Sequence, residues 1–157
     1  MGIKNHYDDG VPLRFAHQYL MSSPAFTAFY GNKLFEPSLI PPKPGEQFVI
    51  VHAVEDEVIL HAGIAEYIAK VACRLDVICI HKYPTGSGSE MQFRQQLKML
   101  RAALCGHCGV DVFELDGITK IGEVDESRYL GKVPFTMYRD GQFDVLQKGI
   151  SLRLVYR

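Results

Sequence analysis

The sequence has little net charge and no long apolar run. Seventeen Lys and Arg residues are balanced by 18 Asp and Glu residues, which gives a formal net charge of -1. Because the basic residues are scattered, the chain lacks the basic stripe with which proteins follow a phosphate backbone. Charged residues also interrupt each apolar stretch well short of the roughly 20 residues that a membrane-spanning helix needs. We therefore expect neither a nucleic-acid partner nor a membrane span.

Cysteine is also sparse, with four residues in the chain. That number is too low for a disulfide scaffold, and Cys73 and Cys79 stand inside apolar runs, where a free thiol behaves as a small hydrophobic group. Residues 1–6 lack the apolar core of a secretory signal, and His6 stands where a myristoylation signal has Ser or Thr. These features predict an intracellular, reducing compartment, either the cytoplasm or an organelle matrix.

What is present is the composition of one folded domain. The 157 residues are 47% hydrophobic and 22% charged, values at which a chain of this length buries a core. Residues 1–46 differ from the rest because they carry six prolines together with several aromatic rings, among them Phe15, Tyr19, Phe26, Phe29, Tyr30 and Phe35. We expect an irregular N-terminal extension over 1–46, with one short helix at about 13–21 and an extended strap at 37–45, followed by a single α/β domain at 47–157.

The order of apolar patterns in 47–157 predicts an α/β fold with a β-α-β-α-β core in an open sheet of two or three layers. Residues 48–54 and 76–83 are β-branched runs typical of buried strands, and the apolar spacing between them favours a helix over 57–74. A second helix over 89–104 and a third strand over 110–115 follow. A short helix at 125–130 and a C-terminal antiparallel meander of three strands, with turns at Asp140-Gly141 and Lys148-Gly149, complete the expected domain.

The loop between the second strand and the second helix is the best-placed ligand site. A loop in this position in an open α/β sheet presents free backbone N–H groups to phosphate. It lacks the Gly-Lys-Ser/Thr ending of a P-loop, and small polar residues also suit an ordinary exposed loop. The candidate binding residues for a phosphate-containing small molecule are Thr85, Gly86, Ser87, Gly88 and Ser89.

Two cysteines form the candidate redox site. Cys105-Gly106-His107-Cys108 has the spacing that allows two thiols to exchange a disulfide, and resembles the active-site tetrad of protein disulfide isomerases. In that family the first Cys opens a helix, whereas here the tetrad follows one, so we expect ordinary or raised thiol pKa values. A structural zinc at the same pair would need further ligands from Cys73, Cys79, His52 or His81. No motif completes that set, so we expect no metal and no cofactor.

Three histidines, His52, His61 and His81, lie in or beside apolar segments. Each could act as a catalytic base, but a histidine in such a run is more often a hydrogen-bonded core residue. The catalytic residues, if the chain is an enzyme, are therefore unknown.

Residues 124–142 resemble the second half of a thioredoxin-like domain. The resemblance rests on the short acidic segment, on Val133-Pro134 and on the Asp140-Gly141 turn, and it implies a cis-proline at Pro134. No Cys pair stands after the strand 48–54, so the resemblance implies a fold without the oxidoreductase chemistry. The order of elements over 47–115 is also similar to that of universal stress proteins, without the glycine signature of their nucleotide loop.

These patterns favour a non-catalytic structural or interaction subunit of a larger assembly, with a protein partner bound through the N-terminal extension. The alternative is a small-molecule or nucleotide-binding domain, with or without catalytic activity, that uses the 85–89 loop. A thiol-disulfide redox protein is the third hypothesis.

Overall fold

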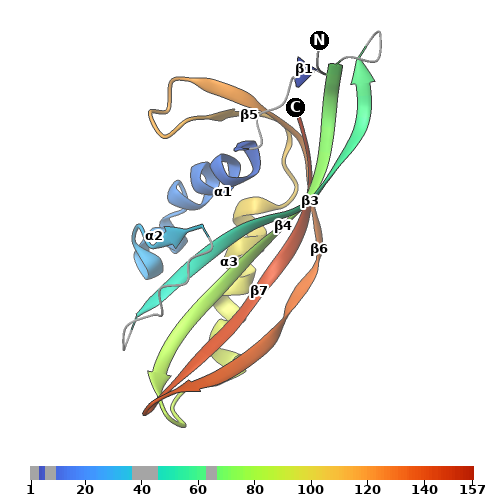
Figure 1. The fold of residues 1–157 in the computed structure, drawn as a ribbon. Coiled ribbons are helices and arrows are strands. Elements are labelled where there is room, and N and C mark those ends of the chain that lie inside the picture. The colour runs from blue at the N-terminus through green and yellow to red at the C-terminus, as the bar shows by residue number, and fades with distance from the viewer. Residues whose placement is uncertain (1–3, 6–9, 37–45, 63–66) are drawn as a thin grey trace.

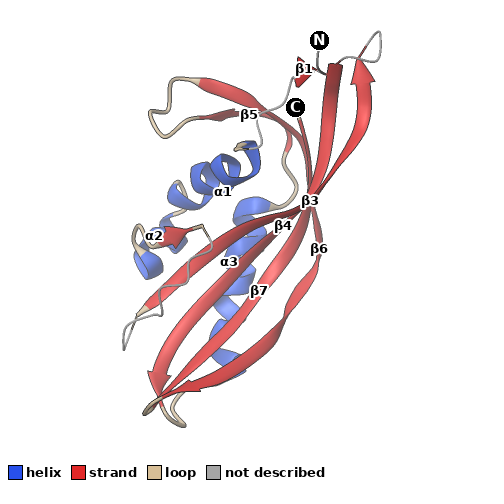
Figure 2. Ribbon diagram, viewed as in Figure 1, coloured by secondary structure: helices blue, strands red, loops and turns tan. Residues whose placement is uncertain are grey.

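The computed structural model describes residues 4–5, 10–36, 46–62 and 67–157. Its framework is a strongly curved sheet with the strand order β2-β3-β4-β7-β6-β5, as Figures 1 and 2 show. The neighbouring long strands pair antiparallel, whereas the two short strands β1 and β2 pair parallel with β4 and β3. The strands are β1 (Lys4–Asn5), β2 (Leu34–Phe35), β3 (Gln47–Ala62), β4 (Tyr67–Pro84), β5 (Cys108–Phe113), β6 (Lys120–Asp140) and β7 (Phe143–Tyr156).

The helices cover the concave face of this sheet (Figure 1). They are α1 (Val11–Met21), α2 (Pro24–Tyr30), the 3-10 helix η1 (Glu90–Phe93) and α3 (Arg94–Leu104). One core forms between them and the sheet, and alternate residues of β4, from Val71 to Cys79, point into it. Burial of this continuous apolar layer is the main source of stability for such a two-layer arrangement.

The N-terminal segment contributes directly to that core. The expected short helix at 13–21 is confirmed as α1, and α2 follows it after the Ser23 cap, whose hydroxyl accepts a hydrogen bond from the Phe26 amide. Phe15 and Phe26 are fully buried and Tyr30 is nearly so, whereas Phe29 and Phe35 are exposed. The strap expected at 37–45 lies outside the described residues. Three of the rings that seemed to require a partner are therefore buried by the chain itself.

The expected β-α-β-α-β core is wrong. The described residues of the segment predicted as a helix over 57–74 form the end of β3 and the start of β4, and these strands pair antiparallel from Gln47 opposite His81 to Ala62 opposite Tyr67. Register shifts interrupt this pairing at three places between Val54 and His61. Each shift displaces the alternation of apolar residues, so that a bulged strand shows apolar residues at the three- and four-residue intervals of a helix. The sheet is consequently a mixed, mainly antiparallel one and not a β-α-β-α-β core.

The C-terminal prediction is also corrected. The helix expected at 125–130 is part of the long strand β6, and the three-stranded meander is a two-stranded hairpin. The turn at Asp140-Gly141 is confirmed, with Gly141 at φ 63°. Gly149 makes no turn: a Cβ atom there would lie 2.1 Å from the backbone oxygen of Val77, so glycine permits the close approach of β7 to β4.

The helix over 89–104 is confirmed as η1 and α3, with a capping box at Ser89, and the third strand is confirmed as β5. Among the described residues, the helices are too short or too polar for any of them to span a membrane.

Candidate functional site

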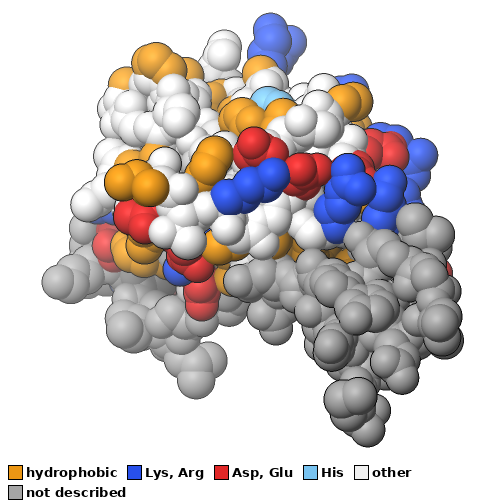
Figure 3. All heavy atoms as spheres, turned by 90° about the horizontal axis from the view of Figure 1, so that it is seen from above, with side chains coloured by type: hydrophobic (Ala, Val, Ile, Leu, Met, Phe, Trp, Pro, Cys, Tyr) orange, Lys and Arg blue, Asp and Glu red, His pale blue; other side chains and the backbone are white. Residues whose placement is uncertain are grey.

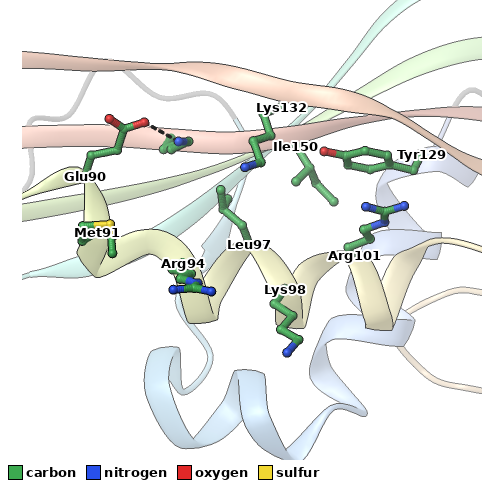
Figure 4. Close-up of a pocket in the computed structure, with 10 residues that line it drawn as sticks. Glu90, Met91, Arg94, Leu97, Lys98, Arg101, Tyr129, Lys132 and Ile150 are labelled. Carbon is green, nitrogen blue, oxygen red and sulfur yellow. Dashed lines mark hydrogen bonds and ion pairs between the residues drawn. The ribbon is translucent and has the colours of Figure 1, made fainter.

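A groove with a volume of about 530 Å³ lies between α3 and the β6–β7 hairpin (Figure 4). One wall is the side of α3 that carries Arg94, Lys98 and Arg101. The opposite wall is formed by Tyr129 and Lys132 of β6 together with Lys148 and Ile150 of β7. The apolar stripe of α3, which ends at Leu104, faces the core, so its basic residues are left beside the sheet.

The groove is strongly basic because five of its side chains are cationic and one, Glu90, is anionic. Glu90 forms an ion pair with Lys148 at one end. At the other end the Arg101 guanidinium lies 3.9 Å from the centre of the Tyr129 ring, a cation–π contact that joins α3 to β6. No carboxylate of the described residues pairs with Arg94, Lys98 or Lys132. The middle of the groove therefore carries positive charge without an internal counter-ion.

The outer wall of the groove is also a free strand edge. β5 covers the outer edge of β6 only as far as the pair Cys108 and Glu126, and Ser127 is bonded to His107. Beyond that point β6 pairs with β7 on one side and with no described strand on the other. Pro134 is compatible with this position, because a proline in a sheet is confined to an edge or a bulge, and a register shift falls between Val133 and Thr136. The exposed large apolar side chains on this edge are Leu130, Met137 and Tyr138.

A second polar cluster lies buried under α2. His81 has no exposed surface, and its Nε2 and Nδ1 atoms lie 2.8 Å and 3.2 Å from the hydroxyls of Tyr30 and Tyr83. Gln47 donates to the Tyr83 hydroxyl at 3.0 Å, and the imidazole stacks on Phe93 with ring centres 4.5 Å apart. Burial lowers the pKa of His81 to about 4, so the imidazole is neutral near pH 7. This arrangement fixes α2 to β4 and fits the core role considered for this histidine.

The other two candidate histidines give no such cluster. His52 is exposed on β3, and the side chain of His61 lies outside the described residues. Among the side chains that the structure describes, no three His, Cys, Asp or Glu residues gather in a way that could hold a metal ion.

Four of the five amides in the predicted phosphate loop donate hydrogen bonds within the chain. The N–H of Gly86 donates to the Asp144 carboxylate at 3.0 Å, the N–H of Thr85 to the Gln142 carbonyl at 3.0 Å, and the N–H of Ser87 to the Pro84 carbonyl at 3.0 Å. Ser89 N–H donates to the Gln92 side chain. Gly88 packs closely, since a Cβ atom there would lie 2.8 Å from the Tyr83 ring. A phosphate would have to displace these bonds and to approach the anionic Asp144.

The thiols of Cys105 and Cys108 lie just after the end of α3 and at the start of β5, as the sequence predicted. Cys105 is partly buried and Cys108 is exposed, and both are free. Burial raises the pKa of the Cys105 thiol, while the nearby Arg101 charge opposes that shift. His107 is turned to other partners: its Nε2 lies 2.8 Å from the Ala103 carbonyl, and its ring lies 3.9 Å from that of Tyr19. The imidazole therefore stabilises the helix end and the packing of α1.

Sequence reasoning missed both the basic groove and the free edge. The groove had a readable signal, because Arg94, Lys98 and Arg101 recur at the intervals that place residues on one helix face. The free edge of β6 also had a readable signal in the sequence, because a proline inside a strand, here Pro134, indicates that one side of the strand is unpaired. Both signals were hidden by the expectation that α3 was a crossover helix and that residues 125–130 were helical.

The residues of the thioredoxin-like resemblance lie in β6 and in the β6–β7 turn, and the Val133–Pro134 peptide bond is trans. No protein-family model matches the chain, and no curated protein is similar to it in sequence.

Proposed function

We propose that this chain is a non-catalytic interaction subunit of a larger protein assembly and that it binds its partner through the outer edge of β6. The observation that carries the proposal is the open edge over residues 128–140. An unpaired strand presents rows of N–H and C=O groups that another strand can bind.

The side chains on this edge support the same proposal. Leu130 is 47% exposed, Met137 55% and Tyr138 47%. Exposed apolar side chains next to unsatisfied backbone groups are a combination that natural proteins usually avoid on a free edge. A partner strand would satisfy the backbone groups and bury these side chains together.

This proposal moves the partner surface away from the N-terminal extension. Phe15, Phe26 and Tyr30 are buried in the core of their own chain, so they do not offer a surface to a partner. The edge of β6 therefore replaces the aromatic N-terminal segment as the proposed partner surface.

The two other hypotheses remain predictions that no contact favours. In the 85–89 loop, the amides of Thr85, Gly86, Ser87 and Ser89 already have acceptors within the chain. In the tetrad, a raised thiol pKa at Cys105 disfavours the thiolate that redox exchange requires.

The test compares two double variants by native mass spectrometry of the chain recovered from its own cell. Leu130→Lys with Tyr138→Lys places two charges on the edge, and Leu115→Lys with Ile118→Lys places two charges at apolar sites that are even more exposed, in the β5–β6 connection. We expect the wild type and the second variant to be recovered in a complex of higher mass, and the first variant to be recovered alone. A wild-type chain that is recovered free, or only with a bound small molecule, contradicts the proposal.

A further inference from the structure

The free edge and the basic groove are two sides of one surface. Tyr129 and Lys132 line the groove and also belong to the segment of β6 near or on its free edge (Figure 4). A strand added to β6 would consequently lie along the mouth of the groove. Every second side chain of that strand would point toward α3, because side chains alternate between the faces of a sheet.

The basic residues of α3 are spaced to meet such a strand. Arg94, Lys98 and Arg101 follow one another at four- and three-residue intervals, which correspond to rises of roughly 6 and 4.5 Å along a helix. Residues on the same face of a strand are separated by roughly 6.6 Å. The spacing of these cations along α3 is thus similar to that of acidic residues at alternate positions of a bound strand, and Figure 4 shows Arg101 directed toward β6 and Lys98 directed away from the strands.

The charges of the groove favour an acidic occupant. Arg94, Lys98 and Lys132 have no anionic partner among the described side chains, and the only carboxylate of the groove, Glu90, is already paired with Lys148. In contrast, the surface seen from above shows basic and acidic side chains next to each other in the described part (Figure 3). The groove therefore differs in its charge from that face of the molecule.

We infer that the edge of β6 binds an extended acidic segment of a partner protein, with acidic side chains at alternate positions directed into the groove. This inference rests on the proposed function and names the chemistry of the partner. Backbone pairing along β6 supplies the register, and the cations of α3 and β6 select the charge.

A polypeptide fits this surface better than a nucleic acid. The open N–H and C=O groups of β6 require a partner with the same alternation of donors and acceptors, which a second strand has and a sugar-phosphate backbone lacks. The exposed Leu130, Met137 and Tyr138 also add apolar contacts that phosphates do not satisfy.

The first experiment measures binding of a fluorescent peptide of about twelve residues with alternating Glu and Thr, long enough to span the edge at roughly 3.3 Å per residue. We expect saturable binding that weakens when NaCl is raised from about 0.05 M to about 0.5 M, because salt screens the ion pairs. A Lys and Thr peptide should not bind, and a peptide of the first composition with prolines inserted should bind far less. If the acidic peptide does not bind, or binds no better than the basic one, the inference is overturned.

Charge reversals on the two walls locate the site. Arg94→Glu on α3 and Lys132→Glu on β6 should each weaken peptide binding roughly tenfold, since charge pairs across an interface are lost and replaced by repulsion. Lys33→Glu is the matched control, because Lys33 is exposed, has no ion pair among the described residues and lies outside the groove. Equal effects of all three reversals would contradict the inference. Stronger binding of a single-stranded DNA probe than of the acidic peptide would overturn it in favour of nucleic acid.

The same reversals separate this inference from the proposed function. The native complex can be lost in the double variant Leu130→Lys with Tyr138→Lys and yet persist in the single variants Arg94→Glu and Lys132→Glu. In that case the edge of β6 is the interface, and the inference of an acidic partner segment is wrong. If the complex consists only of copies of this chain, the inference of an acidic partner protein is also wrong. If the wild type forms no complex, the proposed function itself fails.

Discussion

His81 is a buried neutral imidazole whose protonation should weaken the fold. Its folded-state pKa is lowered to about 4 by burial, below the ordinary value of 6.5, so the unfolded chain binds the proton more readily. Its contribution to stability is therefore complete above about pH 6.5, decreases as the pH falls toward 4, and stays constant below that. The total loss is about 3 kcal/mol at most.

The measurement is urea unfolding of the wild type and of His81→Gln from pH 7.5, about one unit above the interval, down to pH 4, the lower end of the interval. The wild type should lose more stability than the variant over this range, since carboxylates contribute equally to both. Parallel curves for the two proteins would show that the histidine does not titrate as described.

At Gly149, the addition of a single methyl group should lower the stability of the fold. A Cβ atom there would meet the Val77 backbone oxygen at 2.1 Å, whereas a Cβ atom at Gly131 would meet nothing within 4 Å. We expect Gly149→Ala to lower the free energy of unfolding by about 1–3 kcal/mol, and Gly131→Ala to be neutral or slightly stabilising. Thermal unfolding of the two variants checks this, and an unchanged midpoint for Gly149→Ala would refute the close approach of β7 to β4.

At the scale of elements, α2 is a part of the core and not an arm for a partner. Phe26 is fully buried between α2 and the sheet, while Phe29, one turn further along the same helix, is 42% exposed. Phe26→Ala should therefore destabilise the free chain by about 3–5 kcal/mol, and Phe29→Ala by about 1 kcal/mol. Chemical unfolding of the purified chain measures both values. Similar small losses for the two variants would indicate that α2 needs a partner to pack.

The same elements show what the sequence could and could not predict. The helices at Val11–Met21 and over residues 90–104 and the turn at Asp140-Gly141 were predictable, because proline, capping residues and glycine act locally. The β3–β4 hairpin was not, since bulges give its strands the apolar intervals of a helix and its pairing is a long-range property. The helix wrongly predicted over 57–74 then led to a second error, because a helix between two strands implies that the strands are parallel.

The candidate site depended on that topology. The residues Thr85 to Ser89 and Cys105 to Cys108 were read correctly as a loop before a helix and a tetrad after one. Their partners, such as Asp144 for the Gly86 amide and Ala103 for the His107 ring, come from the tertiary fold or from the geometry of the helix end. The groove of α3 and the edge of β6 appear only when the order of the strands is known.

At the scale of the whole molecule, the main core lies between the helices and the sheet, a smaller apolar cluster forms around Phe48, Ile80 and Val145, and the edge of β6 over 128–140 is open to a partner. Hydrogen exchange of the backbone amides, measured for the free chain and for the chain in its native complex, tests this directly. We predict that the amides within 128–140 that point away from β7 exchange quickly in the free chain and become strongly protected in the complex, while the amides that bond β7 and those of β5 change little. If the complex forms and the amides of 128–140 exchange at the same rate as in the free chain, the edge of β6 is not the interface and the central claim is wrong.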